Sequence, residues 1–192
     1  MTSHLEVEIK LPVKDLEDMV RRLQAAGATV AAPRVLEDNH VLDFTDGRLR
    51  QDQVMLRLRL VDGNGLVTVK KKISGDQGDY KIRHEQETVV EDGHGLLATL
   101  HAAGFVTAYR YEKYRRAFRA GNLFITLDEL PLGNFLELEG EPADIDRFAG
   151  LLGFNRTDYI NDSYRALHLR LWAEAGREGE PTELVFPGKA GL

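Results

Sequence analysis

Charged side chains recur at every second position in several stretches of this chain. The first stretch carries Glu6, Glu8 and Lys10, with apolar residues between them. Because successive side chains point to opposite faces of a strand, this spacing predicts a strand with one charged face. The spacing is common in antiparallel sheets, but here it returns as Arg57/Arg59, Lys70/Lys72, Arg83/Glu85/Glu87, Lys113/Arg115 and Glu137/Glu139. The repetition indicates one sheet whose charged residues share a face.

Both signs of charge occur on this face, which suggests a particular chemistry. The acids are Glu6, Glu8, Glu85, Glu87, Asp128, Glu137 and Glu139, and the bases are Lys10, Arg57, Arg59, Lys70, Lys72, Arg83, Lys113 and Arg115. Arginine forks match phosphate oxygens and lysine supplies point charge, so this many bases suit an anion with several phosphate groups. Carboxylates would repel that anion unless they hold Mg²⁺ or Mn²⁺, which prefer oxygen ligands. The combination predicts a metal–triphosphate site, in which the metal orients or activates the attacking oxygen.

The composition narrows the class of protein. The chain has 192 residues, which suits one domain with a real core. A net charge of −6 argues against binding to nucleic acid or to a membrane surface by bulk electrostatics. The absence of cysteine excludes disulfides, thiolate catalysis and cysteine-based zinc sites. The N-terminus predicts no signal peptide, and no apolar run approaches the ~18 residues of a membrane span. We therefore expect a cytoplasmic protein.

Hydrophobic periodicity and turn signals place the charges on strands joined mostly by short turns. The expected strands cover residues 5–12, 35–44, 54–61, 66–73, 80–90, 105–120, 123–130 and 135–139. Helices are expected over residues 15–26, 92–103, 142–152 and 162–173, and a polar loop over residues 74–79. We expect residues 1–175 to form a single domain and residues 176–192, rich in glycine, proline and charge, to be a loosely ordered tail.

A sheet of this size commonly curls or closes, so the charged face must point inward or outward. Charges facing outward would leave a dry interior, empty or suited to a fatty ligand. Charges facing inward would make a polar tunnel, with an apolar outer face for the helices to cover. The helices favour the second arrangement, because each needs an apolar surface on which to bury its own apolar side. The predicted fold class is α+β, an eight-stranded antiparallel β-barrel tunnel with helices packed on the outside.

Several of these stretches, in this order, resemble the motifs of the CYTH superfamily, the triphosphate tunnel metalloenzymes. The first is Glu6-x-Glu8-x-Lys10. The others are Asp43-Phe44-Thr45-Asp46, Leu56-Arg57-Leu58-Arg59, Thr68-Val69-Lys70, Arg83-His84-Glu85 with Glu87, Lys113-Tyr114-Arg115, Leu127-Asp128, Gly133-x-Phe135-x-Glu137-x-Glu139 and Ser163-Tyr164. The resemblance spans most of the chain and implies a CYTH-like eight-stranded antiparallel tunnel. Asp162 departs from the pattern, because many relatives carry a basic residue there, so a phosphate role for the last helix does not follow.

The resemblance also implies roles for the charged residues. Those that would bind the triphosphate are Arg57, Arg59, Lys70, Lys72, Lys113 and Arg115. Those that would hold one or two Mg²⁺ or Mn²⁺ ions are Glu6, Glu8, Asp128, Glu137 and Glu139. The candidate catalytic residues are Lys10, Arg83 and Glu85, of which the two bases would bind phosphate or pair with the acids. Relatives are often dimers, so a homodimer is expected by analogy only.

Three functions are open on this evidence. The first is a phosphohydrolase that cleaves the terminal phosphate of inorganic triphosphate or thiamine triphosphate. The second is a class IV adenylate cyclase, in which the ribose 3′-hydroxyl of ATP attacks the α-phosphorus and pyrophosphate leaves. The third is a non-catalytic binder of polyphosphate or nucleotide, against which the acids argue, because an anion binder would gain from neutral donors. We favour the hydrolase because it requires fewer special features.

Overall fold

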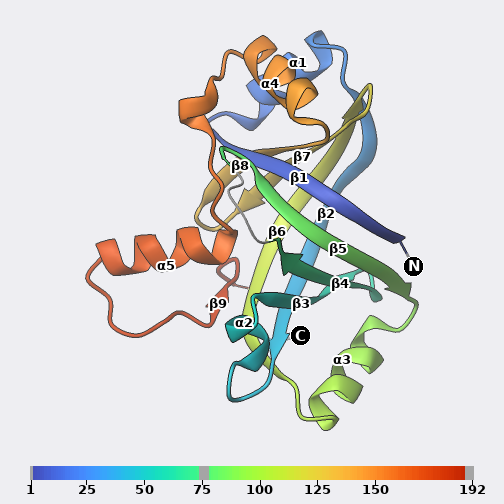
Figure 1. The fold of residues 1–192 in the computed structure, drawn as a ribbon, viewed down its shortest axis with the longest axis vertical. Coiled ribbons are helices and arrows are strands. Elements are labelled where there is room, and N and C mark those ends of the chain that lie inside the picture. The colour runs from blue at the N-terminus through green and yellow to red at the C-terminus, as the bar shows by residue number, and fades with distance from the viewer. Residues whose placement is uncertain (1, 74–77, 189–192) are drawn as a thin grey trace.

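A ring of eight antiparallel strands forms the centre of the protein, seen here in a computed structural model that describes residues 2–73 and 78–188 (Figure 1). The strands are β1 (Thr2–Val13), β2 (Thr29–Asp43), β3 (Val54–Val61), β4 (Asn64–Lys72), β5 (Lys81–Val90), β6 (Val106–Ala120), β7 (Leu123–Leu130) and β8 (Gly133–Glu139). Their order is β2-β3-β4-β5-β1-β8-β7-β6, and β6 pairs with β2 to close the ring. The predicted α+β fold is confirmed. Residues 74–77 of the expected polar loop lie outside the described residues.

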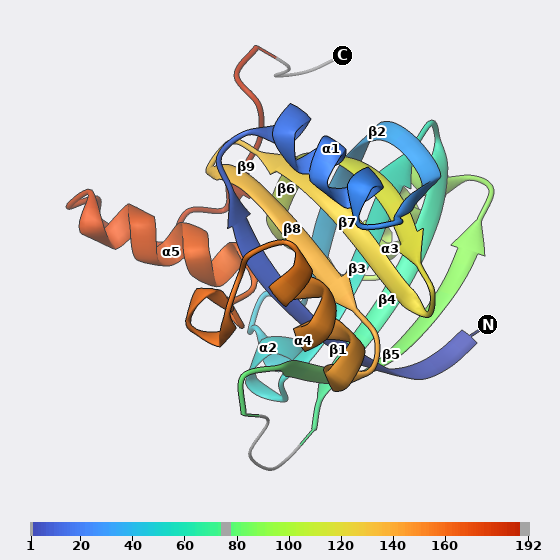
Figure 2. The same cartoon turned by 90° about the horizontal axis from the view of Figure 1, so that it is seen from above.

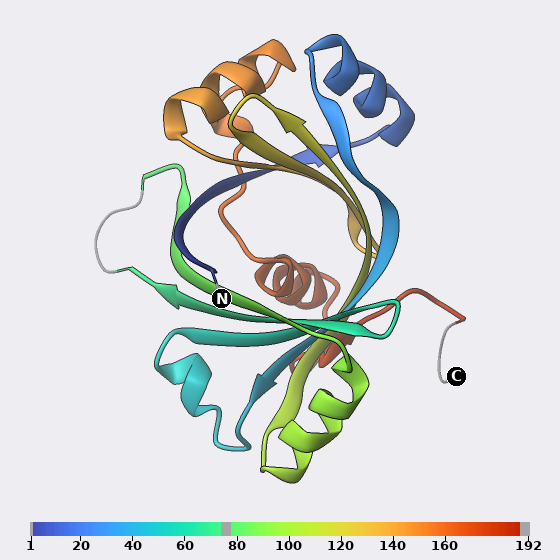
Figure 3. The same cartoon turned by 90° about the vertical axis from the view of Figure 1, so that its right-hand side faces the viewer.

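The alternation of side chains separates a charged inner face from an apolar outer face. On β1, Glu8 lies opposite Glu139 of β8, and Lys10 lies opposite Glu137. Ile9 and Leu11 point the other way and are fully buried in the hydrophobic core. Because an antiparallel ring keeps one face of every strand inside, the charges of all eight strands share one interior. Figure 3 looks through this ring.

Helices cover the apolar outer face on two sides of the ring. Helices α1 (Leu16–Ala25) and α4 (Pro142–Leu151) lie together on one side, and α3 (Gly93–Ala102) lies on the opposite side (Figures 1 and 3). Beneath α1 and α4, the core contains Met19, Leu23 and Phe148 from the helices together with strand residues such as Ile125. The hydrophobic core of this fold is therefore outside the ring, between the sheet and its helices.

A fourth helix, α5 (Tyr164–Glu174), begins at one end of the ring and extends away from it, as Figures 2 and 3 show. Ser163 begins it, because its hydroxyl accepts a hydrogen bond from the Ala166 backbone N–H. The chain then returns to the sheet, where β9 (Glu183–Leu184) pairs with β6 and Leu184 is buried. This pairing lies in the segment that the composition predicted to be a loose tail. No helix in the described part of the chain is long and apolar enough to span a membrane.

Three elements differ from those expected from the sequence. Strand β2 begins at Thr29, ahead of the expected residue 35, and its register with β6 is irregular around Pro33. The turn after β2 contains a short helix, α2 (Arg48–Gln51), because the Asp43 carboxylate accepts hydrogen bonds from the backbone N–H groups of three following residues. A 3₁₀ turn, η1 (Arg156–Asp158), follows α4 and was not predicted.

Gly93, where α3 meets β4, gives a test of this packing. A Cβ at Gly93 would lie 2.5 Å from Leu60 Cδ2 and 2.8 Å from the Gly65 nitrogen. We expect Gly93→Ala to lower the free energy of unfolding by about 1–3 kcal/mol, as overpacking does. Gly150→Ala is the matched control, because it lies in α4 with nothing within 4 Å, and alanine favours a helix by about 1 kcal/mol. Urea unfolding measures both, and equal stability of the two variants would contradict the close packing.

Candidate active site

The ring encloses a cavity of about 790 Å³, and the predicted site residues meet there. Those that line it are Glu6, Glu8, Lys10, Arg57, Arg59, Lys70, Lys72, Arg83, Glu85, Glu87, Lys113, Arg115, Glu137 and Glu139. Asp128, the remaining predicted residue, is fully buried and contacts two of them. Altogether the lining contains twelve lysine or arginine residues and seven aspartate or glutamate residues. The cavity is therefore cationic in a protein whose net charge is −6.

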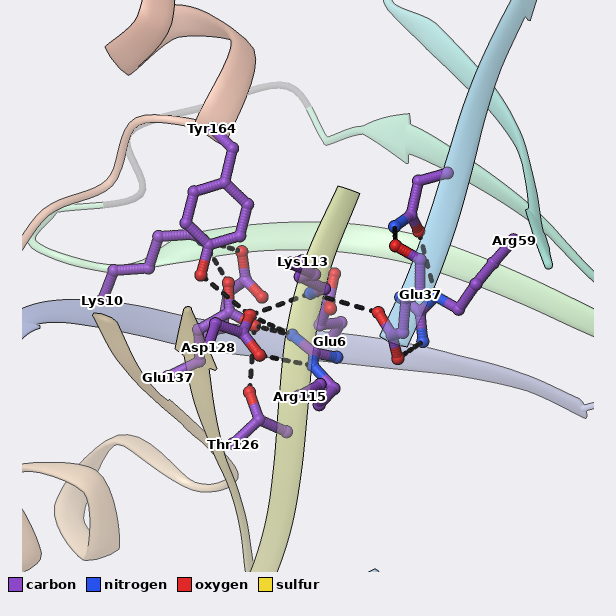
Figure 4. A network of polar contacts seen from close by, with 12 residues as sticks. Glu6, Lys10, Glu37, Arg59, Lys113, Arg115, Thr126, Asp128, Glu137 and Tyr164 are labelled. Carbon is purple, nitrogen blue, oxygen red and sulfur yellow. Dashed lines mark hydrogen bonds and ion pairs between the residues drawn. The ribbon is translucent and has the colours of Figure 1, made fainter. Parts of the chain in front are cut away.

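Asp128 is the most connected carboxylate of the site (Figure 4). It accepts hydrogen bonds from Lys113 Nζ at 2.8 Å and from the Arg115 guanidinium at 2.6 and 2.7 Å. The Tyr164 hydroxyl donates a further bond to it at 2.9 Å. Arg115 also contacts Glu137 at 2.5 Å. Asp128 thus joins β6, β7 and α5 and fixes the directions of two cations that line the cavity.

Lys10 lies between two carboxylates on neighbouring strands. Its ammonium is 2.8 Å from Glu8 Oε1 and 3.1 Å from Glu137 Oε1, and its side chain is almost fully buried. Lys81 also contacts Glu8. Burial would raise the pKa of Glu8, but Lys10 and Lys81 hold that pKa well below its ordinary value. Burial would likewise raise the pKa of Glu137, but Lys10 and Arg115 hold that pKa well below its ordinary value. Both carboxylates are therefore ionised.

A second group of acids surrounds Lys70, which contacts Glu6 and lies 3.0 Å from Glu85 Oε2. Burial raises the pKa of Glu85 to about 8, although the nearby Lys70 ammonium opposes the shift. Glu87, two residues along β5, accepts a hydrogen bond from the Thr68 hydroxyl at 2.8 Å. Burial would raise the pKa of Glu87, but its hydrogen bonds and the nearby arginines lower it. Glu85 is therefore a cavity carboxyl that can exchange a proton near neutral pH.

Two of the charged residues that were not predicted, Glu37 and Lys81, form ion pairs with predicted ones. Glu37, on β2, is buried with its carboxylate 3.1 Å from Arg59 Nη1 and 3.5 Å from Lys113 Nζ. Burial would raise its pKa, but these two cations lower it to about 2. Glu37 stands in a polar run with no alternation to signal its direction. Lys81, by contrast, lies two residues before Arg83, and the spacing used for the other strands could have found it.

Two tyrosines of β6 and one of α5 complete the wall. Arg57 Nη1 donates to the Tyr111 hydroxyl at 3.3 Å, and the Tyr109 hydroxyl lies 2.9 Å from a ring nitrogen of His168. The sequence singled out Tyr164 only as part of the Ser163-Tyr164 motif near the last helix. The structure places its hydroxyl on Asp128, inside the ring. Helix α5 is thus attached to the charged network by a buried side chain.

Four acids of the cavity offer oxygen donors to Mg²⁺ or Mn²⁺. The predicted ligands that line the cavity are Glu6, Glu8, Glu137 and Glu139. Their oxygens have the hard donor chemistry that these ions prefer, and Glu6 Oε2 is buried without a hydrogen-bond partner. Within residues 2–73 and 78–188, no three acidic or histidine side chains form a group that could hold a metal ion. The donors fit the ion chemically, while the Lys10 ammonium lies between two of them.

The chain resembles known proteins in sequence and in fold. The CYTH domain family matches the chain over residues 4–152. No curated protein sequence matches it. The match covers all eight ring strands apart from the first residues of β1.

Several solved structures share the fold. A proposed adenylate cyclase from Vibrio parahaemolyticus is 22% identical, with a TM-score of 0.70 over 84% of this chain and 96% of the other. The PH1012 protein from Pyrococcus horikoshii is 22% identical, with a TM-score of 0.66 over 83% and 96%. A proposed adenylyl cyclase from Hippeastrum, described as revealing a dominant triphosphatase activity, is 19% identical, with a TM-score of 0.62 over 91% and 97%. At these identities the likeness shows the common fold.

The buried carboxylate of Asp128 makes a prediction about stability. We expect Asp128→Ala to lower the free energy of unfolding by about 3–5 kcal/mol, because it leaves two buried cations without their shared partner. Glu129→Ala is the matched control, because Glu129 is the next residue on β7 and pairs with the half-exposed Arg34. A surface pair of this kind contributes about 0–1 kcal/mol. Urea unfolding would contradict the assignment if the two variants were equally stable.

Proposed function

The chain belongs to the CYTH domain family, and from this premise we propose that it is a metal-dependent enzyme that hydrolyses the terminal phosphate of a triphosphate. The observation that carries the proposal is the surplus of lysine and arginine over acids in the cavity lining, in a protein of net charge −6. A surplus of this sign suits a compact polyanion. The substrates that the sequence suggested are inorganic triphosphate and thiamine triphosphate.

The bases of the cavity are held in place by bonds to buried carboxylates. Asp128 orients Arg115 and Lys113, and Glu37 orients Arg59. Side chains that are already ordered lose little freedom on binding, so more of the interaction with phosphate appears as affinity. The same order fixes the triphosphate chain for attack at its terminal phosphorus. We assign phosphate binding to these three bases with Arg57, Lys70 and Lys72.

The cavity acids are assigned to a divalent ion and to proton transfer. CYTH family enzymes generally depend on divalent metal ions. We propose that Glu6, Glu8, Glu137 and Glu139 would hold such an ion after moving closer together, since no three of them form an ion-binding group in the described residues, and that Asp128 orients the bases beside them. When bound, the ion would neutralise phosphate charge and activate the attacking oxygen.

The candidate catalytic residues are Lys10, Arg83 and Glu85, all of which line the cavity. The Glu85 carboxyl, whose pKa burial raises to about 8, is suited to proton exchange with a reacting oxygen near neutral pH. The Lys10 ammonium, held between Glu8 and Glu137, is placed to stabilise negative charge on a phosphoryl oxygen.

A class IV adenylate cyclase is the second candidate. It is favoured by the structural likeness to a proposed adenylate cyclase and by apolar or aromatic residues in the cavity lining, such as Met55 and Tyr109. In that reaction the 3′-hydroxyl attacks the α-phosphorus and pyrophosphate leaves. A non-catalytic binder is the weakest candidate, because the ionised acids weaken anion binding unless they serve another purpose.

Product analysis separates these functions. The protein is incubated with Mg²⁺ or Mn²⁺ and, separately, with inorganic triphosphate, thiamine triphosphate and ATP. We expect orthophosphate as the product of hydrolysis, whereas pyrophosphate together with cyclic AMP from ATP would establish the cyclase. Binding of any of the three compounds with no product from any of them would overturn the enzymatic proposal and leave the binder.

Substitution of the acids tests the metal assignment. We expect Glu8→Gln and Glu137→Gln each to lower metal-dependent turnover by about a hundredfold or more, because each removes a charge aimed at the reacting phosphate or its ion. Glu129→Gln, on the outer face of β7, is the control and should leave turnover unchanged. Circular dichroism checks that each variant is folded. Full turnover in both cavity variants would show that these acids do not hold the ion.

Substitution of Lys113 tests the phosphate assignment. We expect Lys113→Ala to weaken the binding of inorganic triphosphate about tenfold or more, since hydrogen bonds to charged groups contribute about 1.5–3 kcal/mol each. Arg116→Ala removes a base from the opposite face of the same strand, and its affinity should match that of the wild type. Calorimetric titration measures both. Equal affinity of the Lys113 variant and the wild type would count against a phosphate contact at this position.

A further inference from the structure

We propose that Tyr164 is a positioning residue for the reaction, whose aromatic ring holds the ammonium groups of Lys10 and Lys113 at the cavity without neutralising them. The inference rests on the proposed function and deepens it, because it gives α5 a part in the reaction. Tyr164 acts through these two lysines, to which the proposed function assigns charge stabilisation and phosphate binding.

Tyr164 reaches the cavity from the first turn of α5. It is only 7% exposed, and its aromatic ring packs against those of Phe135 and Tyr111, whose centres are 5.4 and 6.3 Å away. Its hydroxyl donates to Asp128 at 2.9 Å (Figure 4). Packing on two aromatic rings, together with a hydrogen bond at the tip, leaves this side chain little freedom. The ring of Tyr164 is therefore fixed well enough to position other groups.

Two ammonium groups lie over this one aromatic ring. Lys10 Nζ is 5.3 Å from the centre of the Tyr164 ring, and Lys113 Nζ is 5.4 Å from it. An ammonium within about 6 Å of an aromatic ring is attracted to the negative charge of its face, and the attraction is stronger where water is excluded. Both lysines are almost fully buried. The ring thus favours one position for each ammonium, although one lysine comes from β1 and the other from β6.

An aromatic ring stabilises a cation without neutralising it. The Lys10 ammonium has three N–H donors, and the carboxylates of Glu8 and Glu137 lie within reach of two of them. A third carboxylate in place of the ring would engage the remaining donor and repel phosphate. An aliphatic side chain there would leave a buried charge with less compensation. The ring of Tyr164 therefore leaves one donor of Lys10 for a phosphoryl oxygen.

The backbone ties the same segment of chain to Lys10. Lys10 and Ile160 form an isolated β-bridge, in which the Lys10 N–H donates to the Ile160 carbonyl at 3.1 Å and the Ile160 N–H donates to the Lys10 carbonyl at 2.9 Å. Four residues later, the Tyr164 ring meets the ammonium of the same lysine. The chain that leads into α5 therefore fixes Lys10 both at its backbone and at its charged end.

Two variants separate the aromatic ring from the hydroxyl. Tyr164→Phe keeps the ring and leaves Asp128 its bonds from Lys113 and Arg115, whereas Tyr164→Leu removes the ring as well. We expect Tyr164→Leu to lower kcat about tenfold, with whichever triphosphate is turned over, and to weaken the binding of inorganic triphosphate about fivefold. Calorimetric titration in a chelating buffer measures the binding. We expect Tyr164→Phe to restore both values to within about twofold of the wild type, because the cations keep their aromatic contact.

Tyr159 gives the matched control. Its hydroxyl also donates to a carboxylate at 2.9 Å, that of Asp146, and its side chain packs on the hydrophobic core outside the ring of strands. We expect Tyr159→Leu to lower the melting temperature, as Tyr164→Leu does, and to leave kcat and triphosphate binding unchanged. No loss in Tyr164→Leu, equal losses in Tyr164→Leu and Tyr164→Phe, or an equal loss in Tyr159→Leu would overturn the inference while the proposed function stands.

Nuclear magnetic resonance of protein with isotopically labelled lysine needs no turnover. The ε-methylene protons of Lys10 and Lys113 should resonate upfield of ordinary lysine values, because they lie in the ring current of Tyr164. We expect both upfield signals in the wild type and in Tyr164→Phe, assigned by their loss in Lys10→Arg and Lys113→Arg. Ordinary shifts in the wild type would overturn the inference. Upfield signals in a protein that converts no triphosphate would overturn the proposed function and the catalytic role of Tyr164 with it, while the placement of the lysines would stand.

Discussion

The buried bonds between Asp128 and the cations of β6 are the interaction on which the rest of the structure depends. Taking an ion out of water costs several kcal/mol, and a buried pair offsets this only with good geometry and further hydrogen bonds. Asp128 has both, because Lys113, Arg115 and Tyr164 all donate to its two oxygens. Since these donors come from β6 and α5, the same bonds stabilise the charged interior and the attachment of α5 to the ring.

An inward-facing set of charges determines where the hydrophobic core can be. Ile9, Leu11 and Leu136 are fully buried on the outer face of the ring, against α1 and α4. Burial of apolar surface contributes about 25 cal/mol per Å², so most of the favourable free energy of folding arises outside the ring. A ring with a charged interior therefore needs the helices, because without them its apolar outer face would be exposed to water.

Period-two spacing predicted the strands and their charged face because both are local properties of the sequence. Closure of the ring depends instead on pairing between β2 and β6, which brings together residues as distant as Asn39 and Tyr111. No local pattern in the sequence predicts such a pairing, and none predicts the pairing of β9 with β6. Glu37 was not predicted because it begins a run of polar residues, so the sequence does not show which face of the strand it occupies. The pairing of β2 with β6 decides this. Lys81 carried the usual spacing and was predictable.

The pairing of the cavity bases also determines which anions can compete for them. Lys10, Lys113 and Arg115 each contact two carboxylates. An anion must replace these contacts, so a single phosphate would gain little from any one base. A chain of phosphates reaches several bases at once and also meets the surplus of positive charge in the lining. On the proposed function, the paired acids would make the cavity selective for the total charge of the ligand, because a weakly charged anion cannot offset the contacts that it displaces.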